Sequence, residues 1–327
     1  MDLMETKTSE KIIEYIKEKG QVSGSELSRH LGITDRAVRK QLNALLEKGV
    51  LSKVGKAPKV YYLLSVEKVS NSSYSLPKEI QDVINENFSV ISPAGERIEG
   101  FFGFIFWCEK RNEPVEKTAR EYVATIKKYG RYKKDGLIDG MYKMKHTFSN
   151  VSVDKLYYLD FYSIERFGKT KLGQLLLYAK QSQNRELIKE LVNDIKPKVD
   201  LLLKKNKIDA VGFIPPTVKR EVQFMKELER DLALVLPTVN LVKAKTPIIV
   251  PQKTLNKLED RVENAQKTII VDDTKKYKIV LLFDDALGSG ATLNETAKKL
   301  KQQGVAKIVI GLSITGSFSG FEIISEV

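Results

Sequence analysis

The sequence predicts a multi-domain protein, with a small α+β domain at the N-terminus, an α/β middle region of uncertain kind and a C-terminal α/β domain on a parallel sheet. Three observations support this prediction. Residues 1–66 show helical apolar spacing and then two strand-like segments. Residues 67–77 have the polar composition of a linker, and helices alternate with apolar strands over about residues 156–327. Residues 78–155 form a middle region without a recognisable functional pattern.

The first segment is predicted to form three helices and a β-hairpin. One helix ends near Gly20, a second begins at Ser23, and a third covers about residues 35–48. Strand-like segments follow at residues 50–54 and 59–64. This order of elements resembles the winged helix-turn-helix family of bacterial DNA-binding domains. The resemblance implies double-stranded DNA as a partner and, because such domains commonly bind two-fold sites, a homodimer.

The distribution of charge favours the same interpretation. The chain has a net charge of +13, and the span from Arg36 to Lys59 holds seven basic residues and one acidic residue, Glu47. The polar side of the third helix is where a recognition helix presents groups to the major groove. The residues predicted to contact DNA are Arg36, Arg39, Lys40, Gln41, Lys53, Lys56 and Lys59. A winged helix that contacts protein, with a merely solvated basic face, stays open as the alternative.

The middle region is harder to interpret. The apolar run from Arg97 to Cys108 predicts a buried strand, and residues 116–127 predict a helix. Residues 127–134 interleave cations with aromatics, a pattern that suits either a nucleic-acid contact or a solvated turn. Cys108 is the single cysteine, and its apolar neighbours predict a core position. One cysteine excludes internal disulfides and suits a reducing cytosol.

The C-terminal segment predicts a parallel sheet with a ligand site at its edge. Strands are expected at residues 210–214, 278–283 and 307–312, with a helix over residues 292–303 between the last two. A strand–helix–strand unit of this length predicts a right-handed parallel crossover. The ligand is expected at the carboxyl ends of these strands.

Residues 279–293 carry the main chemical signal. An apolar strand ends in Asp284 and Asp285, and a turn of small residues then opens a helix. Carboxylates accept hydrogen bonds from ribose hydroxyls or hold a hydrated Mg²⁺, and backbone N–H groups at a helix N-terminus bind phosphate. The spacing of Thr292 and Glu295 predicts a capping box at the helix start. The residues predicted to bind phosphate are Gly288, Ser289, Gly290, Ala291 and Thr292.

This stretch resembles the phosphoribosyl pyrophosphate (PRPP) signature of type I phosphoribosyltransferases, except that Gly288 stands where that family has a Thr. A wider resemblance, to the amidophosphoribosyltransferase-like ComF family, covers about residues 156–327. It rests on the acidic pair, on the residues after the first strand, and on a later segment that reads Gln-x-x-Leu-x-x-x-x-x-Arg-x-x-Asn in this sequence. The residues of these two parts are Pro215, Pro216, Gln252, Leu255, Arg261 and Asn264. Residues 221–224 depart from the basic run of that family.

These resemblances imply a site for PRPP or another phosphorylated nucleotide. They imply Mg²⁺, held indirectly by Asp284 and Asp285, which would be the catalytic residues if the domain is active. They also imply a pyrophosphate-side loop in which Lys219 and Arg220 are the charge partners. Gln252, Arg261 and Asn264 suit a ligand contact and a structural role equally well.

Composition narrows the class of protein. No signal-peptide pattern occurs at the N-terminus, and the longest apolar run is too short to cross a bilayer, so a cytoplasmic protein without a membrane role is expected.

The favoured hypothesis is a DNA-binding regulator whose phosphoribosyltransferase-like domain senses PRPP or a related nucleotide. One alternative is an active phosphoribosyltransferase, or an effector that cleaves glycosidic bonds, directed to nucleic acid. Another is a competence-type module that binds single-stranded DNA or protein.

Overall fold

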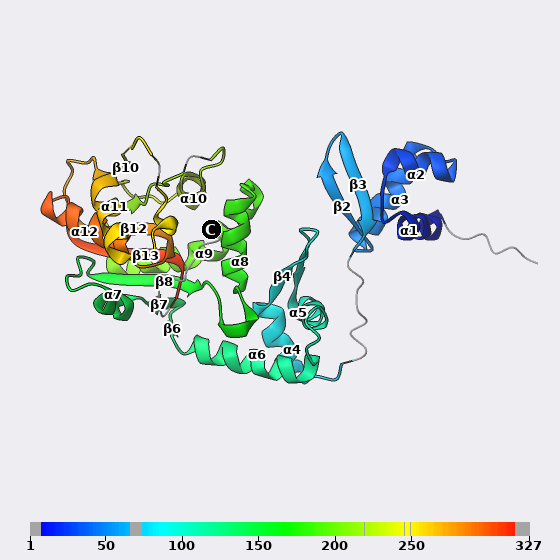
Figure 1. Cartoon of the computed structure of the whole chain (residues 1–327), viewed down its shortest axis with the longest axis horizontal. Coiled ribbons are helices and arrows are strands. Elements are labelled where there is room, and N and C mark those ends of the chain that lie inside the picture. The colour runs from blue at the N-terminus through cyan, green and yellow to red at the C-terminus, as the bar shows by residue number, and fades with distance from the viewer. Residues whose placement is uncertain (1–7, 66–73, 219, 245, 249, 318–327) are drawn as a thin grey trace, which may run out of the picture.

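The computed structural model describes residues 8–65, 74–218, 220–244, 246–248 and 250–317, with the side chains of Lys56 and Lys253 excepted. Residues 8–65 lie at one end of the molecule and the C-terminal α/β part lies at the other (Figure 1). The helices and hairpin of residues 78–130 lie between them. No helix among the described residues is long and apolar enough to cross a membrane.

The N-terminal part forms the predicted three helices and hairpin. Ser23 caps the second helix in a capping box with Glu26, and Thr34 caps the third by accepting a hydrogen bond from the Ala37 amide at 3.3 Å. A small three-stranded antiparallel sheet, in the order β1-β3-β2, packs on the buried sides of the helices. The elements are α1 Thr8–Lys19, β1 Gln21–Ser23, α2 Gly24–Leu31, α3 Asp35–Glu47, β2 Leu51–Lys56 and β3 Lys59–Leu64.

The middle region corrects one prediction. The strand expected over Arg97–Cys108 is wrong, because only Arg97–Glu99 is extended and Gly100–Glu109 is a helix. Most of that helix is buried, so its sequence has no polar face and lacks the 3.6-residue period that separates a helix from a buried strand. The helix predicted over residues 116–127 is confirmed. The elements are α4 Lys78–Asn87, β4 Ser89–Ile91, β5 Arg97–Glu99, α5 Gly100–Glu109 and α6 Val115–Gly130.

The cationic and aromatic side chains of residues 127–134 make contacts with other parts of the chain. Lys128 pairs with Glu165 at 2.6 Å, and Lys133 pairs with Asp160 at 2.7 Å. The rings of Tyr129 and Tyr132 both meet Phe161 edge to face. These contacts favour a structural role for residues 127–134 over a nucleic-acid contact.

The C-terminal part is built on a mixed six-stranded sheet in the order β6-β7-β8-β13-β12-β9. The last four of these strands are parallel, whereas β6 and β7 form an antiparallel edge contributed by residues 133–139. The elements are β6 Lys133–Lys134, β7 Leu137–Asp139, α7 Met141–Thr147, β8 Lys155–Phe161, η2 Glu165–Phe167, α8 Lys171–Gln181, α9 Arg185–Asn206, β9 Ala210–Phe213, α10 Phe224–Leu232, β10 Leu241–Lys243, η3 Gln252–Thr254, α11 Leu258–Thr268, β11 Ile269–Val271, β12 Tyr277–Leu287, α12 Ala291–Gln302 and β13 Ala306–Gly316.

Helices cover both faces of this sheet. Side chains alternate between the two faces along β12, and this alternation decides on which face Asp284 and Asp285 each lie. Along β12, Leu282 packs in the core that contains α12, whereas Phe283 packs in the core that contains α8, α9 and α10. β12 runs on to Leu287, beyond the predicted end at residue 283. Asp284 therefore continues the α12 side and Asp285 continues the α8 side.

Candidate functional site

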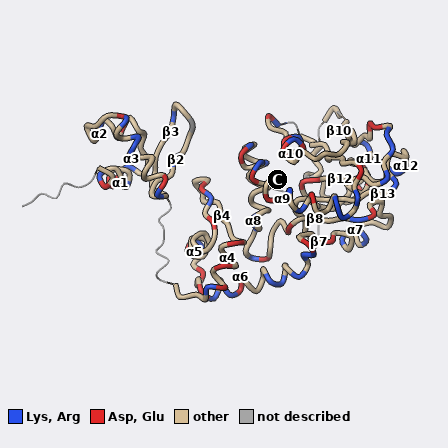
Figure 2. The backbone as a smooth tube through the Cα atoms, turned by 180° about the vertical axis from the view of Figure 1, so that it is seen from behind, with Lys and Arg blue, Asp and Glu red and all other residues tan. Residues whose placement is uncertain are grey.

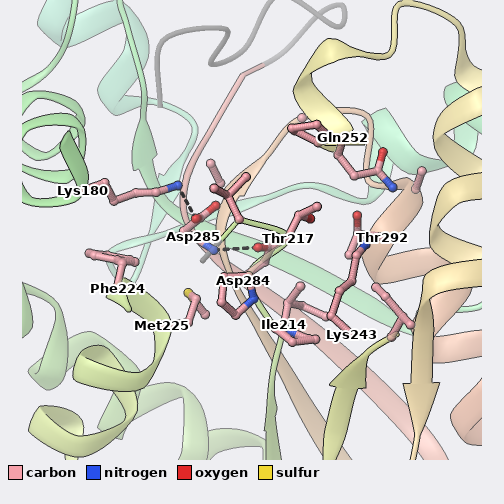
Figure 3. A pocket seen from close by; sticks show the side chains of 18 of the residues that line it. Lys180, Ile214, Thr217, Phe224, Met225, Lys243, Gln252, Asp284, Asp285 and Thr292 are labelled. Atoms are coloured by element: carbon pink, nitrogen blue, oxygen red, sulfur yellow. Dashed lines mark hydrogen bonds and ion pairs between the residues drawn. The ribbon is translucent and has the colours of Figure 1, made fainter. Parts of the chain in front are cut away.

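A cavity of about 250 Å³ lies at the carboxyl ends of β9 and β12, where the sequence predicts the ligand. Its walls are the loop after β9 (residues 214–218), the start of α10 (residues 223–225) and the segment 284–292. Lys180 and Thr292 point toward it from opposite sides (Figure 3). All the predicted acidic and phosphate-binding residues line this cavity, so the fold brings them together.

The acidic pair forms the floor of the cavity. The Asp285 amide donates to Asp284 Oδ1 at 2.8 Å, and Lys180 Nζ makes an ion pair with Asp285 Oδ2. Burial, followed by the charge of Asp285, raises the pKa of Asp284 to about 8, although Lys180 and Lys243 act in the opposite direction. Burial and the neighbouring carboxylate thus both favour the neutral form of Asp284.

The turn before α12 lines the cavity and satisfies part of its own backbone. Gly290 is the N-cap with φ of 81°, the Ala291 amide donates to Ser289 Oγ at 3.3 Å, and the Gly288 amide donates to the Ala286 carbonyl at 3.2 Å. A Cβ at Gly290 would lie 2.4 Å from Met144 Sδ, so glycine is required both by conformation and by space. The predicted capping box of Thr292 and Glu295 is wrong, because the helix begins at Ala291 and Thr292 already lies in its first turn. The positive end of the α12 dipole at this turn suits an anion.

Two lysines that were not predicted as site residues line the cavity. Lys180 comes from the last turn of α8, and Lys243 ends the short strand β10. Lys243 donates to Asn264 Oδ1 at 3.3 Å, and burial lowers its pKa to about 8 against the opposing effect of Asp284. Nothing local in the sequence marks either residue, since each reaches the cavity only through the packing of its element on the sheet.

The predicted pyrophosphate-side residues have different outcomes. Lys219 lies outside the described residues. Arg220 lines the cavity, and its Nη1 donates to the Lys180 carbonyl at 2.5 Å, which caps the end of α8. Its own carbonyl accepts from Gln223 Nε2 at 2.7 Å. Arg220 therefore links the loop after β9 to α8.

Gln252, Arg261 and Asn264 tie the segment between β10 and β11 together. Arg261 Nε donates to the Leu255 carbonyl at 2.7 Å, and Gln252 Nε2 donates to the Arg261 carbonyl at 2.9 Å. Gln252 and Arg261 line the cavity, whereas Asn264 reaches it only through its hydrogen bond to Lys243. These bonds favour the structural role for all three residues.

The predicted DNA-contacting residues lie on α3 and on the β2–β3 hairpin (Figure 2). Arg36, Arg39 and Lys40 are exposed on α3, and Gln41 beside them is half-buried. On the hairpin, Lys53 and Lys59 are exposed, while the side chain of Lys56 lies outside the described residues. The opposite side of α3 is buried through Val38, Leu42 and Leu45, so the basic side chains face away from the core.

Comparison with known proteins identifies the N-terminal part. Residues 8–63 match the family model described as an HTH domain, which implies DNA as a partner of this part of the chain. No curated protein matches the chain. A solved structure, that of a hypoxanthine phosphoribosyltransferase from Staphylococcus aureus, is similar at 16% identity over 42% of this chain and 70% of that one, with a TM-score of 0.25.

Proposed function

We propose that this protein is a DNA-binding regulator whose C-terminal domain is phosphoribosyltransferase-like and senses PRPP or a related nucleotide. One observation carries the proposal. The chain that holds the HTH domain also holds a cavity with an acidic pair, Asp284 and Asp285, beside the N-terminus of helix α12. The helix N-terminus suits the phosphate of a phosphorylated ribose, and the acidic pair suits its hydroxyls.

The phosphate half rests on backbone geometry and on charge. The turn over residues 288–291 lies at the positive end of the α12 dipole. Lys180, Arg220 and Lys243 add positive charge around the same cavity. An anion at this turn would meet both the dipole and these three cations.

The ribose half rests on the carboxylates. Asp284 and Asp285 have oxygens that can accept hydrogen bonds from two neighbouring hydroxyls. Two carboxylates also suit a hydrated Mg²⁺ that arrives on ligand phosphates, whose charge the metal would neutralise. Among the described residues, no group of three or more His, Cys, Asp or Glu could hold a metal ion by itself. Any Mg²⁺ would therefore depend on oxygens of the ligand.

Helix α8 offers a route from the cavity to the HTH domain. Its C-terminal turn carries Lys180, and near its N-terminus Gln174 Nε2 donates to the Ser89 carbonyl of β4. Lys171 of α8 also pairs with Glu99 of β5 at 3.3 Å. At the turn of this β4–β5 hairpin, Glu96 accepts a hydrogen bond from Ser52 of β2 at 3.0 Å. A ligand that moves Lys180 would thus act on a helix that contacts the β4–β5 hairpin, and that hairpin contacts β2 of the HTH domain.

DNA binding by α3 and the β2–β3 hairpin, as a homodimer on a two-fold site, completes the proposal. Ligand and DNA must then change each other's affinity by the same factor. The experiment is fluorescence anisotropy of duplex DNA from the gene's own upstream region, titrated at fixed salt with and without PRPP, in Mg²⁺ and in EDTA. A shift of about fivefold or more in the dissociation constant is expected.

The variant that separates the two sites is Asp284→Asn with Asp285→Asn. It should lose the response to ligand and keep the DNA affinity of the ligand-free protein. DNA affinity that ignores PRPP and nucleotides in the unchanged protein would overturn the regulator hypothesis. Release of pyrophosphate from PRPP in the presence of a base would establish the enzyme alternative.

A further inference from the structure

Lys180 already occupies the side of the acidic pair that faces α8. Its ion pair with Asp285 is largely removed from water, since the two side chains are only 15% and 22% exposed. Figure 3 shows Lys180 pointing at Asp285 from one wall of the cavity, while Thr292 and Gln252 lie across from it. The protein itself thus supplies a cation to this carboxylate.

Three contacts fix this cation. Besides its ion pair, the Lys180 ammonium lies 5.8 Å from the centre of the Phe224 ring, which also lines the cavity. The Lys180 backbone carbonyl accepts the hydrogen bond from Arg220 at 2.5 Å. The residue is therefore held at its backbone and at its ammonium group, so it meets a ligand in a defined position.

A cation held in this way changes what the carboxylate can bind. A divalent metal at Asp285 would have to displace the ammonium or sit beside it, and like charges in a site with little water repel strongly. Mg²⁺ also gives up its water reluctantly and needs several oxygens in octahedral geometry. An ammonium keeps three N–H donors, so Lys180 can hold Asp285 and donate to a ligand oxygen as well.

We propose that Lys180 takes the place of a divalent metal at the acidic pair, so that the site binds a sugar or nucleoside monophosphate without Mg²⁺. The inference rests on the proposed function and narrows its ligand class. One phosphate would lie at the turn of residues 288–291, the hydroxyls would meet Asp284 and Asp285, and Lys180 would donate to a hydroxyl or ring oxygen. Lys180 is thus the residue that sets the metal requirement of the site.

The test is calorimetric titration of the full chain with ribose 5-phosphate, with adenosine 5′-monophosphate and with PRPP, each in EDTA and in Mg²⁺. The monophosphates should bind with dissociation constants that agree within about twofold in the two buffers. In Lys180→Met, affinity in EDTA should fall at least about tenfold, and Mg²⁺ should restore part of it. Lys180→Arg keeps the charge and should retain metal-independent binding. Lys189→Met, at an exposed lysine of α9, is the matched control and should behave as the unchanged protein.

A second measurement follows the metal directly. In the presence of ribose 5-phosphate, electron paramagnetic resonance of Mn²⁺ should detect no tight binding to the unchanged protein and new binding to Lys180→Met, provided the variant keeps its circular dichroism spectrum. Monophosphate binding that requires Mg²⁺ in the unchanged protein would overturn this inference and leave the proposed function standing. Failure of every phosphorylated ribose to bind in either buffer would overturn both.

Discussion

Ser52 of the HTH domain donates its hydroxyl to Glu96 Oε1 at 3.0 Å, at the turn of the β4–β5 hairpin. The two residues are 44 positions apart in the sequence, and their hydrogen bond joins β2 to the middle region. The hairpin is tied in turn to α8, which carries Lys180 into the ligand cavity. The middle region thus contacts both elements that carry the proposed binding residues, β2 of the HTH domain and α8.

The first prediction concerns this contact. Glu96→Ala should leave the affinity for DNA alone and for ligand alone unchanged, because Glu96 lies in neither site. The factor by which ligand changes DNA affinity should fall toward one, since the hairpin no longer holds β2. Anisotropy titrations with and without ligand measure this factor. The control is Glu186→Ala, at an exposed ion pair within α9. A coupling factor equal to that of the unchanged protein would exclude Glu96 from the route.

The second prediction tests the other end of the hairpin. Gln174→Leu keeps the size of the side chain and removes the donor to the Ser89 carbonyl. Coupling should again fall, while the melting temperature should drop only slightly, by the loss of about 1 kcal/mol that a typical hydrogen bond contributes. Combined with Glu96→Ala, the loss of coupling should be less than additive, because both residues act on one hairpin. Fully additive losses would indicate two separate routes.

The sequence predicts the N-terminal domain well because its signals are local. The second helix begins after Ser23 and the third covers residues 35–47, close to the predicted bounds, and apolar spacing marks the buried sides of α1 and α3. The acidic pair and the small-residue turn are likewise contiguous, so a short motif locates the cavity. Helix α5 escapes prediction because burial on all sides removes its period.

Lys180 and Lys243 show the limit of sequence reasoning for the site. Lys180 and Asp285 are 105 positions apart, and only the packing of α8 on one face of the sheet brings them together. Lys243 depends in the same way on the short β10–β11 pairing. A motif consists of residues that are close together in the sequence. These two lysines, in contrast, reach the cavity only through tertiary packing.

The third prediction concerns the DNA-binding face. Arg39→Ala and Lys40→Ala each remove an exposed cation from α3 without touching its buried side. Each should weaken DNA binding and reduce the slope of log affinity against log salt by about 0.9 if the side chain contacts one phosphate. Lys11→Ala, at an exposed position of α1, is the control. Salt slopes equal to that of the unchanged protein in both variants would argue that α3 serves another partner.

The fourth prediction concerns Cys108 and the core of the middle region. The side chain is buried, and burial raises the pKa of its thiol to about 12. Because the thiolate is the reactive form, the folded protein at pH 8 should react with a disulfide reagent at least about a thousand times more slowly than the protein in denaturant. Absorbance of the released thiolate follows the reaction. Rapid stoichiometric labelling of the folded chain would contradict the buried position.

The fifth prediction concerns the pH dependence of ligand binding. Burial lowers the pKa of Lys243 to about 8 and raises that of Asp284 to about 8. As the pH rises through this value, Lys243 loses its positive charge and Asp284 gains a negative charge, and both changes disfavour an anion. The ligand phosphate has a second pKa of about 6 and is largely ionised at pH 7, so its own titration contributes little above that pH. Affinity for ribose 5-phosphate should therefore fall between pH 7 and pH 9.5, by about tenfold or more.

Two variants show how much of this pH dependence comes from Asp284 and how much from Lys243. Asp284→Asn removes the carboxylate that gains charge, and Lys243→Met removes the ammonium that loses it. Each should show a shallower fall in affinity across the same pH range than the unchanged protein, and Lys243→Met should also bind more weakly at pH 7. Calorimetric titrations at matched ionic strength measure both quantities. Affinity that stays constant or rises between pH 7 and pH 9.5 in the unchanged protein would mean that neither group meets the anion.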